Sequence, residues 1–232
     1  KSKPSKINTK QYQKIIKEND LNKLIIDLNK KSIISVDTET SSLDPQVAEL
    51  IGISLSYAKN ISFYIPVVHK NIKSLNKDFV IKKLKPILED PSIKKVGQNI
   101  KYDFIILKKY GVELNSVEDT MLLSYTLDAG NNRHNMDTLS ELHLNHKTIS
   151  YKDLVGSGKK QLKFSEVDID KATEYAAEDA DVTLRLYEIL SERVSDEKLS
   201  QIYEAFEKPM IKILSKLETY GIKVDYNYLK EL

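Results

Sequence analysis

The chain has 232 residues, of which 41% are hydrophobic and 30% charged, with a formal net charge of +2. This length suits one large domain or two small ones, and the composition excludes a collagenous or disordered chain. The absence of cysteine excludes disulfides, zinc–thiolate sites and a cysteine nucleophile. No apolar stretch approaches the roughly 18 residues that a membrane-spanning helix needs, so we expect a soluble protein.

In the first hundred residues, the sequence predicts five short strands and two helices. Apolar residues at helical spacing indicate helices over 21–28, which Asp20 can cap at the N-terminus, and over 77–89. Short runs of β-branched residues predict strands at residues 12–16, 33–38, 50–56, 61–66 and 93–96. Because only a polar turn separates residues 50–56 from 61–66, these two strands form a predicted hairpin.

The remaining chain predicts mostly helices. Extended structure is expected over residues 112–117, and a loop over 151–164. Helices are expected over residues 99–110, 120–127 with Asp119 as N-cap, 137–144, 171–194 and 199–220 with Gly221 as C-cap. Residues 222–232 look like a strand and a helix without room to finish, which suggests a piece of a longer protein. A hairpin followed by alternating strands and helices predicts an α/β domain with a mixed sheet.

Two acidic residues end the predicted strand at 33–38. Asp37 and Glu39 lie two residues apart, so their side chains share one face of a strand. Like charges placed in this way repel each other, and a divalent cation is their natural partner. The alternative is a solvated strand end that leads into the turn at Ser41 and Ser42.

A third acid, Asp103, lies among apolar residues on its predicted helix. It shares a stripe with Ile100, Ile106, Leu107 and Tyr110. An acid near a helix N-terminus is favourable by itself, which is the alternative interpretation. That alternative leaves unexplained why the acid faces the core.

The fourth acid, Asp179, falls on the small and apolar stripe of the 171–194 helix. Tyr175 precedes it by four residues on the same face. Glu178 and Asp181 are predicted on the solvated side, where Asp181 can pair with Arg185. The alternative is an acid packed against the sheet by chance.

Four acids directed toward one buried place are unstable without a cation. Oxygen ligands without cysteine select Mg²⁺ or Mn²⁺. Phosphodiester chemistry with two metals about 3.5–4 Å apart is the natural task of such a site.

Three segments carry a family resemblance: residues 36–40 (VDTET), 97–103 (GQNIKYD) and 175–181 (YAAEDAD). They resemble, in order, the three motifs of the DEDDy 3′–5′ exonucleases. More narrowly, nearly the whole chain resembles the proofreading domain of bacterial-type family A DNA polymerases, the DNA polymerase I family, and organellar members would look alike. We therefore expect an exonuclease domain over residues 1–195, with 196–232 as a connecting helix and the start of a polymerase domain.

The resemblance implies a ribonuclease-H-like fold of three layers, with a mixed sheet of about five strands. It also implies that Asp37, Glu39, Asp103 and Asp179 hold two divalent ions, Mg²⁺ or Mn²⁺. One ion is held by Asp37, Glu39 and Asp179, and the other by Asp37 and, partly through water, by Asp103. Tyr175 matches the tyrosine that orients the attacking water; its ordinary pKa near 10 suits a hydrogen-bond donor better than a base.

The same resemblance implies contacts with DNA. Leu43 matches an apolar wedge against the terminal bases, Arg133 matches a phosphate-binding arginine, and Tyr151 replaces the usual phenylalanine. The implied substrate-binding residues are Thr40, Leu43, Asn99, Tyr102, Arg133 and Tyr151. Alternatively, Leu43 anchors a turn in the core and Arg133 forms a surface ion pair.

The predicted function is metal-dependent removal of nucleotides from the 3′ end of single-stranded or frayed DNA, releasing nucleoside 5′-monophosphates. We expect a monomer, no membrane partner, and a place in the bacterial cytoplasm or nucleoid, or in an organelle if the source is an A/T-rich eukaryote. An exoribonuclease of the same superfamily would share every metal ligand and differ in its tolerance of the 2′-hydroxyl. A non-catalytic scaffold is the other alternative, and the presence of all four acids and Tyr175 disfavours it.

Overall fold

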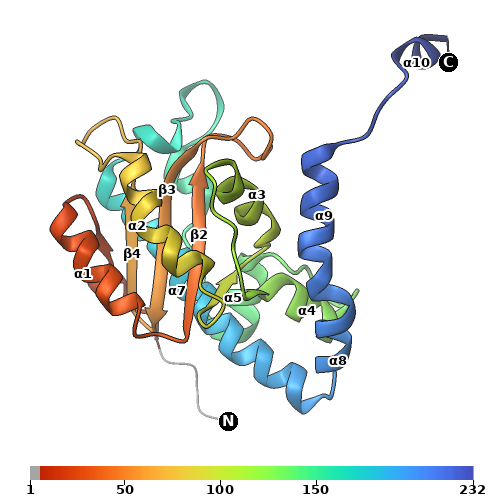
Figure 1. Ribbon diagram of the computed structural model, residues 1–232. Coiled ribbons are helices and arrows are strands. Elements are labelled where there is room, and N and C mark those ends of the chain that lie inside the picture. The colour runs from red at the N-terminus through yellow and green to blue at the C-terminus, as the bar shows by residue number, and fades with distance from the viewer. Residues whose placement is uncertain (1–5, 232) are drawn as a thin grey trace.

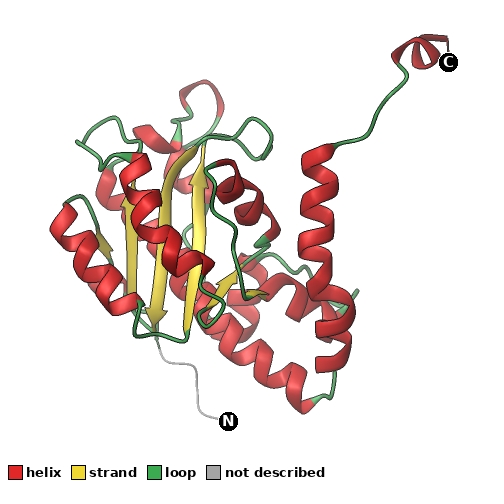
Figure 2. Cartoon of the chain, in the orientation of Figure 1, coloured by secondary structure: helices red, strands yellow, loops and turns green. Residues whose placement is uncertain are grey.

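A computed structural model describes residues 6–231, and its centre is a mixed β-sheet with helices on both faces (Figures 1 and 2). Six strands form within these residues, in the spatial order β1 (Gln13–Lys14), β4 (Ile61–Pro66), β3 (Leu50–Ala58), β2 (Ile33–Thr40), β5 (Lys94–Gly97) and β6 (Val117–Asp119). Strands β2, β3 and β4 are antiparallel neighbours, whereas β5 and β6 run parallel to β2. The predicted α/β class, mixed sheet and hairpin are confirmed, with one strand more than expected.

Two layers of helices cover the sheet. Helices α1 (Glu18–Leu28) and α2 (Lys77–Glu89) pack on one face, and the long helix α7 (Ile169–Asp196) crosses the other face against β2, β3 and β4. Helices α4 (Thr120–Asp128) and α5 (Met136–Leu144) pack against α7. The predicted sandwich of helices around a sheet is therefore present.

Side chains alternate between the two faces of the sheet along β2, and this alternation determines which of them face α7. Ile34 and Val36 are fully buried in the core with α1 and α2. Ser35 faces the other way and donates a hydrogen bond to the Ala180 carbonyl of α7 over 2.6 Å. Because side chains two apart share a face, Asp37 and Glu39 also point toward α7.

Several element boundaries differ from the prediction. Helix α3 (Lys101–Lys109) begins two residues later than expected, because Asn99 adopts a left-handed backbone with φ of 58°. The Asp119 carboxylate accepts the backbone N–H groups of Asn99 and Ile100, both over 3.0 Å, and it also caps α4 as predicted. In the region 112–117, only the last residue joins the sheet, at β6.

Two predictions about irregular regions were wrong. The expected loop at 151–164 contains α6 (Tyr151–Val155), which the Ser150 side chain caps. Residues 222–231 form no strand within the described chain, whereas the helix expected there is present as α10 (Tyr226–Glu231). In both places a short polar sequence carries too little periodicity to predict the structure.

The expected helix at 199–220 is continuous but irregular. It consists of α8 (Ser200–Ile202), a π-helical turn (Tyr203–Glu207) and α9 (Lys208–Tyr220), which ends before Gly221 at φ of 67°. Helix α9 packs against α3 through buried Ile211 and otherwise stands beside the body of the domain (Figure 1). No helix within residues 6–231 is long and apolar enough to cross a membrane.

Candidate active site

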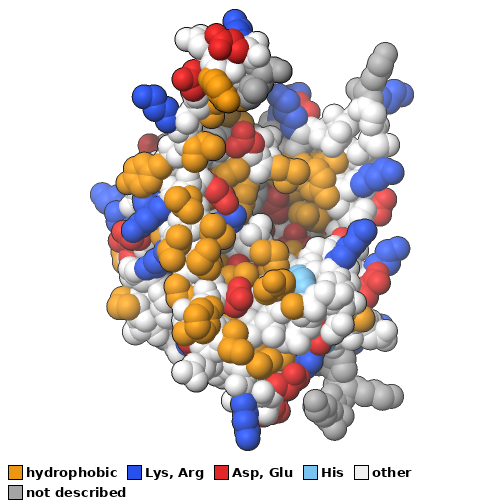
Figure 3. Space-filling view, turned by 90° about the vertical axis from the view of Figure 1, so that its right-hand side faces the viewer, with side chains coloured by type: hydrophobic (Ala, Val, Ile, Leu, Met, Phe, Trp, Pro, Cys, Tyr) orange, Lys and Arg blue, Asp and Glu red, His pale blue; other side chains and the backbone are white. Residues whose placement is uncertain are grey.

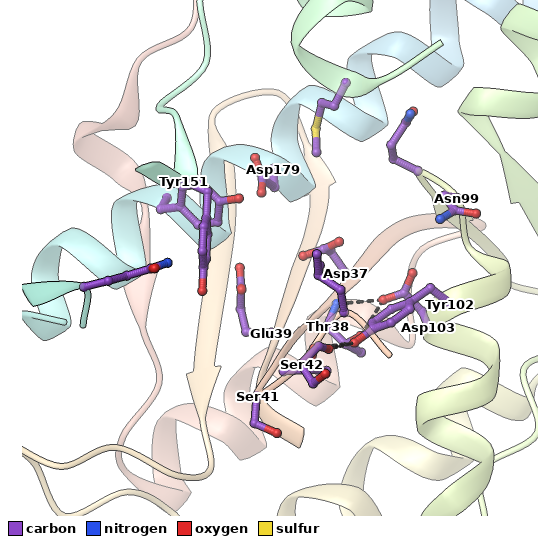
Figure 4. A pocket seen from close by; sticks show the side chains of 16 residues that line it. Asp37, Thr38, Glu39, Ser41, Ser42, Asn99, Tyr102, Asp103, Tyr151 and Asp179 are labelled. Carbon is purple, nitrogen blue, oxygen red and sulfur yellow. Dashed lines mark hydrogen bonds between the residues drawn. The ribbon is translucent and has the colours of Figure 1, made fainter. Parts of the chain in front are cut away.

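A cleft of about 740 Å³ opens where β2 ends beside the middle of α7 (Figures 3 and 4). Its walls come from β2 and the following loop, the start of α3, α6 and α7. Of the predicted site residues, ten line this cleft: Asp37, Glu39, Thr40, Leu43, Asn99, Tyr102, Asp103, Tyr151, Tyr175 and Asp179. Residues separated by up to 142 positions in the sequence therefore meet in one place.

Three carboxylates form the floor of the cleft. One oxygen each of Asp37, Glu39 and Asp179 lies within 4.8 Å of the other two, a spacing at which one cation can contact all three. Asp37 and Glu39 come from β2, and Asp179 comes from α7 on the opposite side (Figure 4). Glu39 and Asp179 are only 8% and 7% exposed.

Burial and mutual repulsion disfavour the charged forms of these acids. Burial raises the pKa of Asp37 to about 6. Burial, and then the charges of Asp37 and Asp179, hold the pKa of Glu39 well above its usual range. The pKa of Asp179 is raised by the same causes, burial first and the Asp37 charge second. A divalent cation among them would reverse this unfavourable balance.

The donor set fits a hard divalent ion. Oε1 of Glu39 is buried and has no hydrogen-bond partner within the described residues, so a lone pair remains available. Carboxylate oxygens are the ligands preferred by Mg²⁺ and Mn²⁺.

Asp103 lies at the side of the cleft, held in a fixed orientation. Its Oδ1 accepts hydrogen bonds from the backbone N–H of Thr38 over 2.8 Å and from the Thr38 hydroxyl over 2.6 Å. Burial, followed by the Asp37 charge, raises the pKa of Asp103 well above its usual value, although the Thr38 bonds oppose the shift. The predicted inward orientation of Asp103 is confirmed, because only 3% of the residue is exposed.

Tyr175 lies one helical turn before Asp179 and shares the cleft with it. Burial raises the pKa of its phenol far above the ordinary value, and the negative charges of Asp179 and Glu39 raise it further. The phenol therefore stays protonated at neutral pH, so its hydrogen is available for a hydrogen bond.

The prediction that Glu178 and Asp181 lie on a solvated side of α7 is wrong. Glu178 is 2% exposed; it accepts the Ile149 N–H over 2.7 Å and contacts Nε2 of His146 over 2.8 Å. Asp181 and Arg185 form the predicted pair, at 2.9 Å, but they are 0% and 2% exposed. Distant segments cover this face of α7, which helical periodicity within the helix cannot reveal.

The loop after β2 presents an apolar tip to the cleft. Leu43 is 95% exposed, so the alternative interpretation of it as a core residue is wrong. The Tyr102 hydroxyl hydrogen-bonds the Thr40 hydroxyl and the Ser42 carbonyl, which ties this loop to α3. The exposed leucine is thus carried by an anchored loop.

Aromatic rings form another wall. Tyr151 is 44% exposed, and its ring lies 6.5 Å from that of Phe164 in a stacked arrangement and 6.1 Å from that of Tyr175, edge to face. Phe164 also contacts Tyr175 at 6.0 Å. A half-exposed ring on a packed support is suited to stacking on a base.

Arg133 does not line the cleft. It lines a neighbouring pocket of about 700 Å³ together with Tyr125 and His134. Gln98 connects the two places, because it lines the cleft and donates to the His134 carbonyl over 2.7 Å. The predicted contact of Arg133 with a phosphate remains a prediction.

Some cleft residues were missed by the sequence interpretation. Thr38 and Gln98 lie inside the quoted motifs, so a closer inspection of those motifs could have included them. Met136 and Gln161 also line the cleft, and no signal in the sequence marks either one.

Comparison with known proteins shows the family to which this chain belongs. A family model described as 3′–5′ exonuclease matches residues 12–195. The chain belongs to this 3′–5′ exonuclease family. The match begins just before β1 and ends near the C-terminus of α7, so it includes every element that lines the cleft.

Relatives of this exonuclease include much longer proteins. It is 44% identical to DNA polymerase I of Rhizobium leguminosarum, over 91% of this chain and 23% of the relative. DNA polymerase I of Pseudomonas aeruginosa is 40% identical, over 87% of this chain and 23% of that protein. The chain thus spans about a quarter of the length of these relatives.

Solved structures share the fold of this exonuclease. Pol1 of M. smegmatis, in a structure with a DNA primer-template and dNTP, has a TM-score of 0.73 at 18% identity and covers 94% of this chain and 34% of its own. Brucella melitensis NrnC has a TM-score of 0.68 at 22% identity, covering 91% and 93% of the two chains. At these identities the likeness concerns the fold alone.

Proposed function

We propose that this exonuclease uses two divalent ions to hydrolyse the terminal phosphodiester of single-stranded or frayed DNA and releases nucleoside 5′-monophosphates. The observation that carries the proposal is the meeting of three carboxylates within 4.8 Å in an open cleft. Such a cluster is unfavourable by itself and suits a cation that acts on phosphate oxygens.

Four acids would hold the ions. Asp37, Glu39 and Asp179 would hold one ion, and Asp37 and, partly through water, Asp103 would hold the other, with Mg²⁺ or Mn²⁺ as the metal. When bound, two such ions lower the pKa of water and stabilise the charge on the attacking and leaving oxygens.

The protein supplies orientation. The protonated phenol of Tyr175 donates a hydrogen bond to the attacking water. Leu43 contacts the last bases, and Tyr151 stacks on one of them. Thr40, Asn99 and Tyr102 border the scissile phosphate, and Arg133 contacts a phosphate farther along the strand.

The relatives suggest a proofreading role within a longer polymerase. In this proposal, residues 1–195 are the exonuclease domain, and 196–232 lead into the polymerase domain of the same chain. The protein acts as a monomer on bacterial DNA, in the cytoplasm. Ribonucleic acid is the alternative substrate, because the ligands alone do not discriminate against a 2′-hydroxyl.

A degradation assay tests this function. The protein is incubated with a 5′-labelled single-stranded DNA, or with an RNA of the same sequence, in Mg²⁺, Mn²⁺ or EDTA. We expect DNA to shorten one nucleotide at a time from its 3′ end in either metal and to stay intact in EDTA. Faster degradation of the RNA would favour the exoribonuclease, and activity in EDTA would contradict the metal site.

Replacing Tyr175 with phenylalanine tests the role of the phenol. The ring stays in place, so metal binding persists, while the attacking water loses one hydrogen bond. By analogy with the loss of a single oxyanion donor, we expect the rate to fall by about 10²–10³. The measurement is single-turnover cleavage of a short DNA across a pH series.

The pH profile separates an orienting group from a base. Because burial and the neighbouring acids raise the pKa of Tyr175, we expect the attacking water, and not the phenol, to lose the proton. The rate of Tyr175→Phe should then still rise with pH, parallel to the parent. A flat profile in the variant beside a rising one in the parent would make Tyr175 the base.

A further inference from the structure

Several buried oxygen atoms without partners lie on one face of the sheet. Among them are Oε1 of Glu39, on β2, Oγ of Ser54, on β3, and the hydroxyl of Tyr64, on β4; none has a hydrogen-bond partner within residues 6–231. Tyr64 is fully buried, so bulk solvent does not reach its hydroxyl. Buried polar groups without partners are rare in native proteins, and each calls for an explanation.

Gly52 leaves space for the Tyr64 side chain near Glu39. It lies on β3, between the two strands, and is the direct cross-strand neighbour of Glu39. A Cβ built at Gly52 would lie 2.3 Å from Cε2 of Tyr64 and 2.5 Å from its hydroxyl oxygen. The edge of the Tyr64 ring and its hydroxyl therefore occupy the space of the missing side chain, at the position next to Glu39 in the sheet.

General sheet geometry places the Tyr64 phenol near Glu39. Side chains of direct cross-strand neighbours have Cβ atoms about 4.5–5.5 Å apart, and the phenol occupies the Cβ position of Gly52, the neighbour of Glu39. The electrostatics agree, because the pKa of Tyr64 is raised first by burial and then by the charge of Glu39.

We propose that Tyr64 is a positioning residue for Glu39: its phenol donates a hydrogen bond to one carboxylate oxygen and so orients the other toward the metal. The inference rests on the proposed metal site. Partners of this kind, which contact a ligand and not the metal, fix the orientation of the ligand and tune its affinity.

Packing alone does not account for the hydroxyl. The Tyr64 ring packs edge to face against Phe164 at 6.1 Å, a contact that phenylalanine would make equally well. A buried hydroxyl without a partner is unfavourable in the metal-free protein. The bond to Glu39 gives it a partner when the carboxylate is charged and bound to a cation.

The test is a titration with Mn²⁺ alone, followed by the melting temperature. The Tyr64→Phe variant should be as stable as the parent without metal, or more stable. It should need about 10–100 times more Mn²⁺ for the same rise in melting temperature, as is typical when such a partner is removed. Cleavage of single-stranded DNA should show the same shift in Mn²⁺ dependence, with most of the rate restored at saturating Mn²⁺.

Tyr203→Phe is the matched control. The Tyr203 hydroxyl is buried and bonded to Glu118 and to the Asp119 N–H, and Tyr203 does not line the cleft. This control should melt at a lower temperature and keep the Mn²⁺ dependence of the parent.

The outcomes distinguish the positioning role of Tyr64 from the proposed metal site. An unchanged Mn²⁺ dependence in Tyr64→Phe, with normal binding by the parent, would overturn the positioning role and leave the proposed function standing. An equal weakening in Tyr203→Phe would also overturn it, because the effect would then reflect stability. Failure of the parent to bind Mn²⁺ would refute the metal site and this inference together.

Discussion

Replacing Asp37 with alanine should abolish exonuclease activity and leave the fold intact. Asp37 belongs to the cluster of three carboxylates, and its charge contributes to the raised pKa of both Glu39 and Asp179. In the proposed site it is the one acid that contacts both ions, so its loss weakens both metal positions. The measurement is cleavage of labelled single-stranded DNA at saturating Mn²⁺, with circular dichroism as a check on the fold.

The stability of the metal-free variant gives a second result. The pKa of Asp37 is about 6 in the folded protein and about 4 in an unfolded chain. Between these values the folded state binds more protons, so the contribution of Asp37 to stability falls as pH rises from about 4 to 6. Without metal, Asp37→Ala should melt at the same or a higher temperature than the parent at pH 7, and any advantage should vanish near pH 4.

An exposed acid provides the control. Asp27 lies on α1 with its side chain 49% exposed, and its contact is an ion pair with Lys30 at the surface. Asp27→Ala should keep the parental activity. Substantial activity in Asp37→Ala at saturating Mn²⁺ would contradict the assignment of the site.

Arg185→Met should lower the free energy of unfolding more than the other substitutions named above. The pair of Arg185 with Asp181 is buried, and Asp181 also accepts hydrogen bonds from the Tyr12 hydroxyl and the Asn60 N–H. Removing the guanidinium leaves a buried carboxylate without its cation, which typically costs about 3–5 kcal/mol. Urea unfolding at pH 7 measures the difference.

The control for this prediction is an exposed pair. Lys14 contacts Asp170, whose side chain is 77% exposed. Lys14→Met should change the free energy of unfolding by less than about 1 kcal/mol, as is typical of surface pairs. A loss of similar size in Arg185→Met would mean that the buried pair is not an important tie between α7 and the rest of the fold.

Local sequence patterns predicted the elements that carry the acids. The β-branched run at β2, the two-residue spacing of Asp37 and Glu39, and the apolar stripe that includes Asp179 all correspond to the structure. These signals are local, because strand and helix periodicity determine which side chains share a face. Their meeting in one cleft required the motif resemblance, since periodicity says nothing about which elements become neighbours.

Because periodicity does not show which elements become neighbours, Glu178 and Asp181 were wrongly predicted to be exposed. Glu178 and Asp181 occupy positions that a single helix would expose, but the segment after α5 and the N-terminal residues around Tyr12 cover them. Buried acids with distant partners look like surface acids in a sequence. The positions of Asn99 and Arg133 depend on loops, for which periodicity gives no information.

The central place of β2 in the sheet divides the cleft into a floor and a rim with different dynamics. Strand β2 is paired on both sides, with β3 and with β5, so its amides should open for hydrogen exchange only in large-scale unfolding. Leu43 and Tyr151 belong to a loop and a five-residue helix, which should exchange much sooner. Binding of single-stranded DNA should therefore slow hydrogen exchange at the rim and leave exchange of the amides beneath the carboxylates nearly unchanged. Substrate binding and metal ligation would then belong to separate cooperative units of the fold.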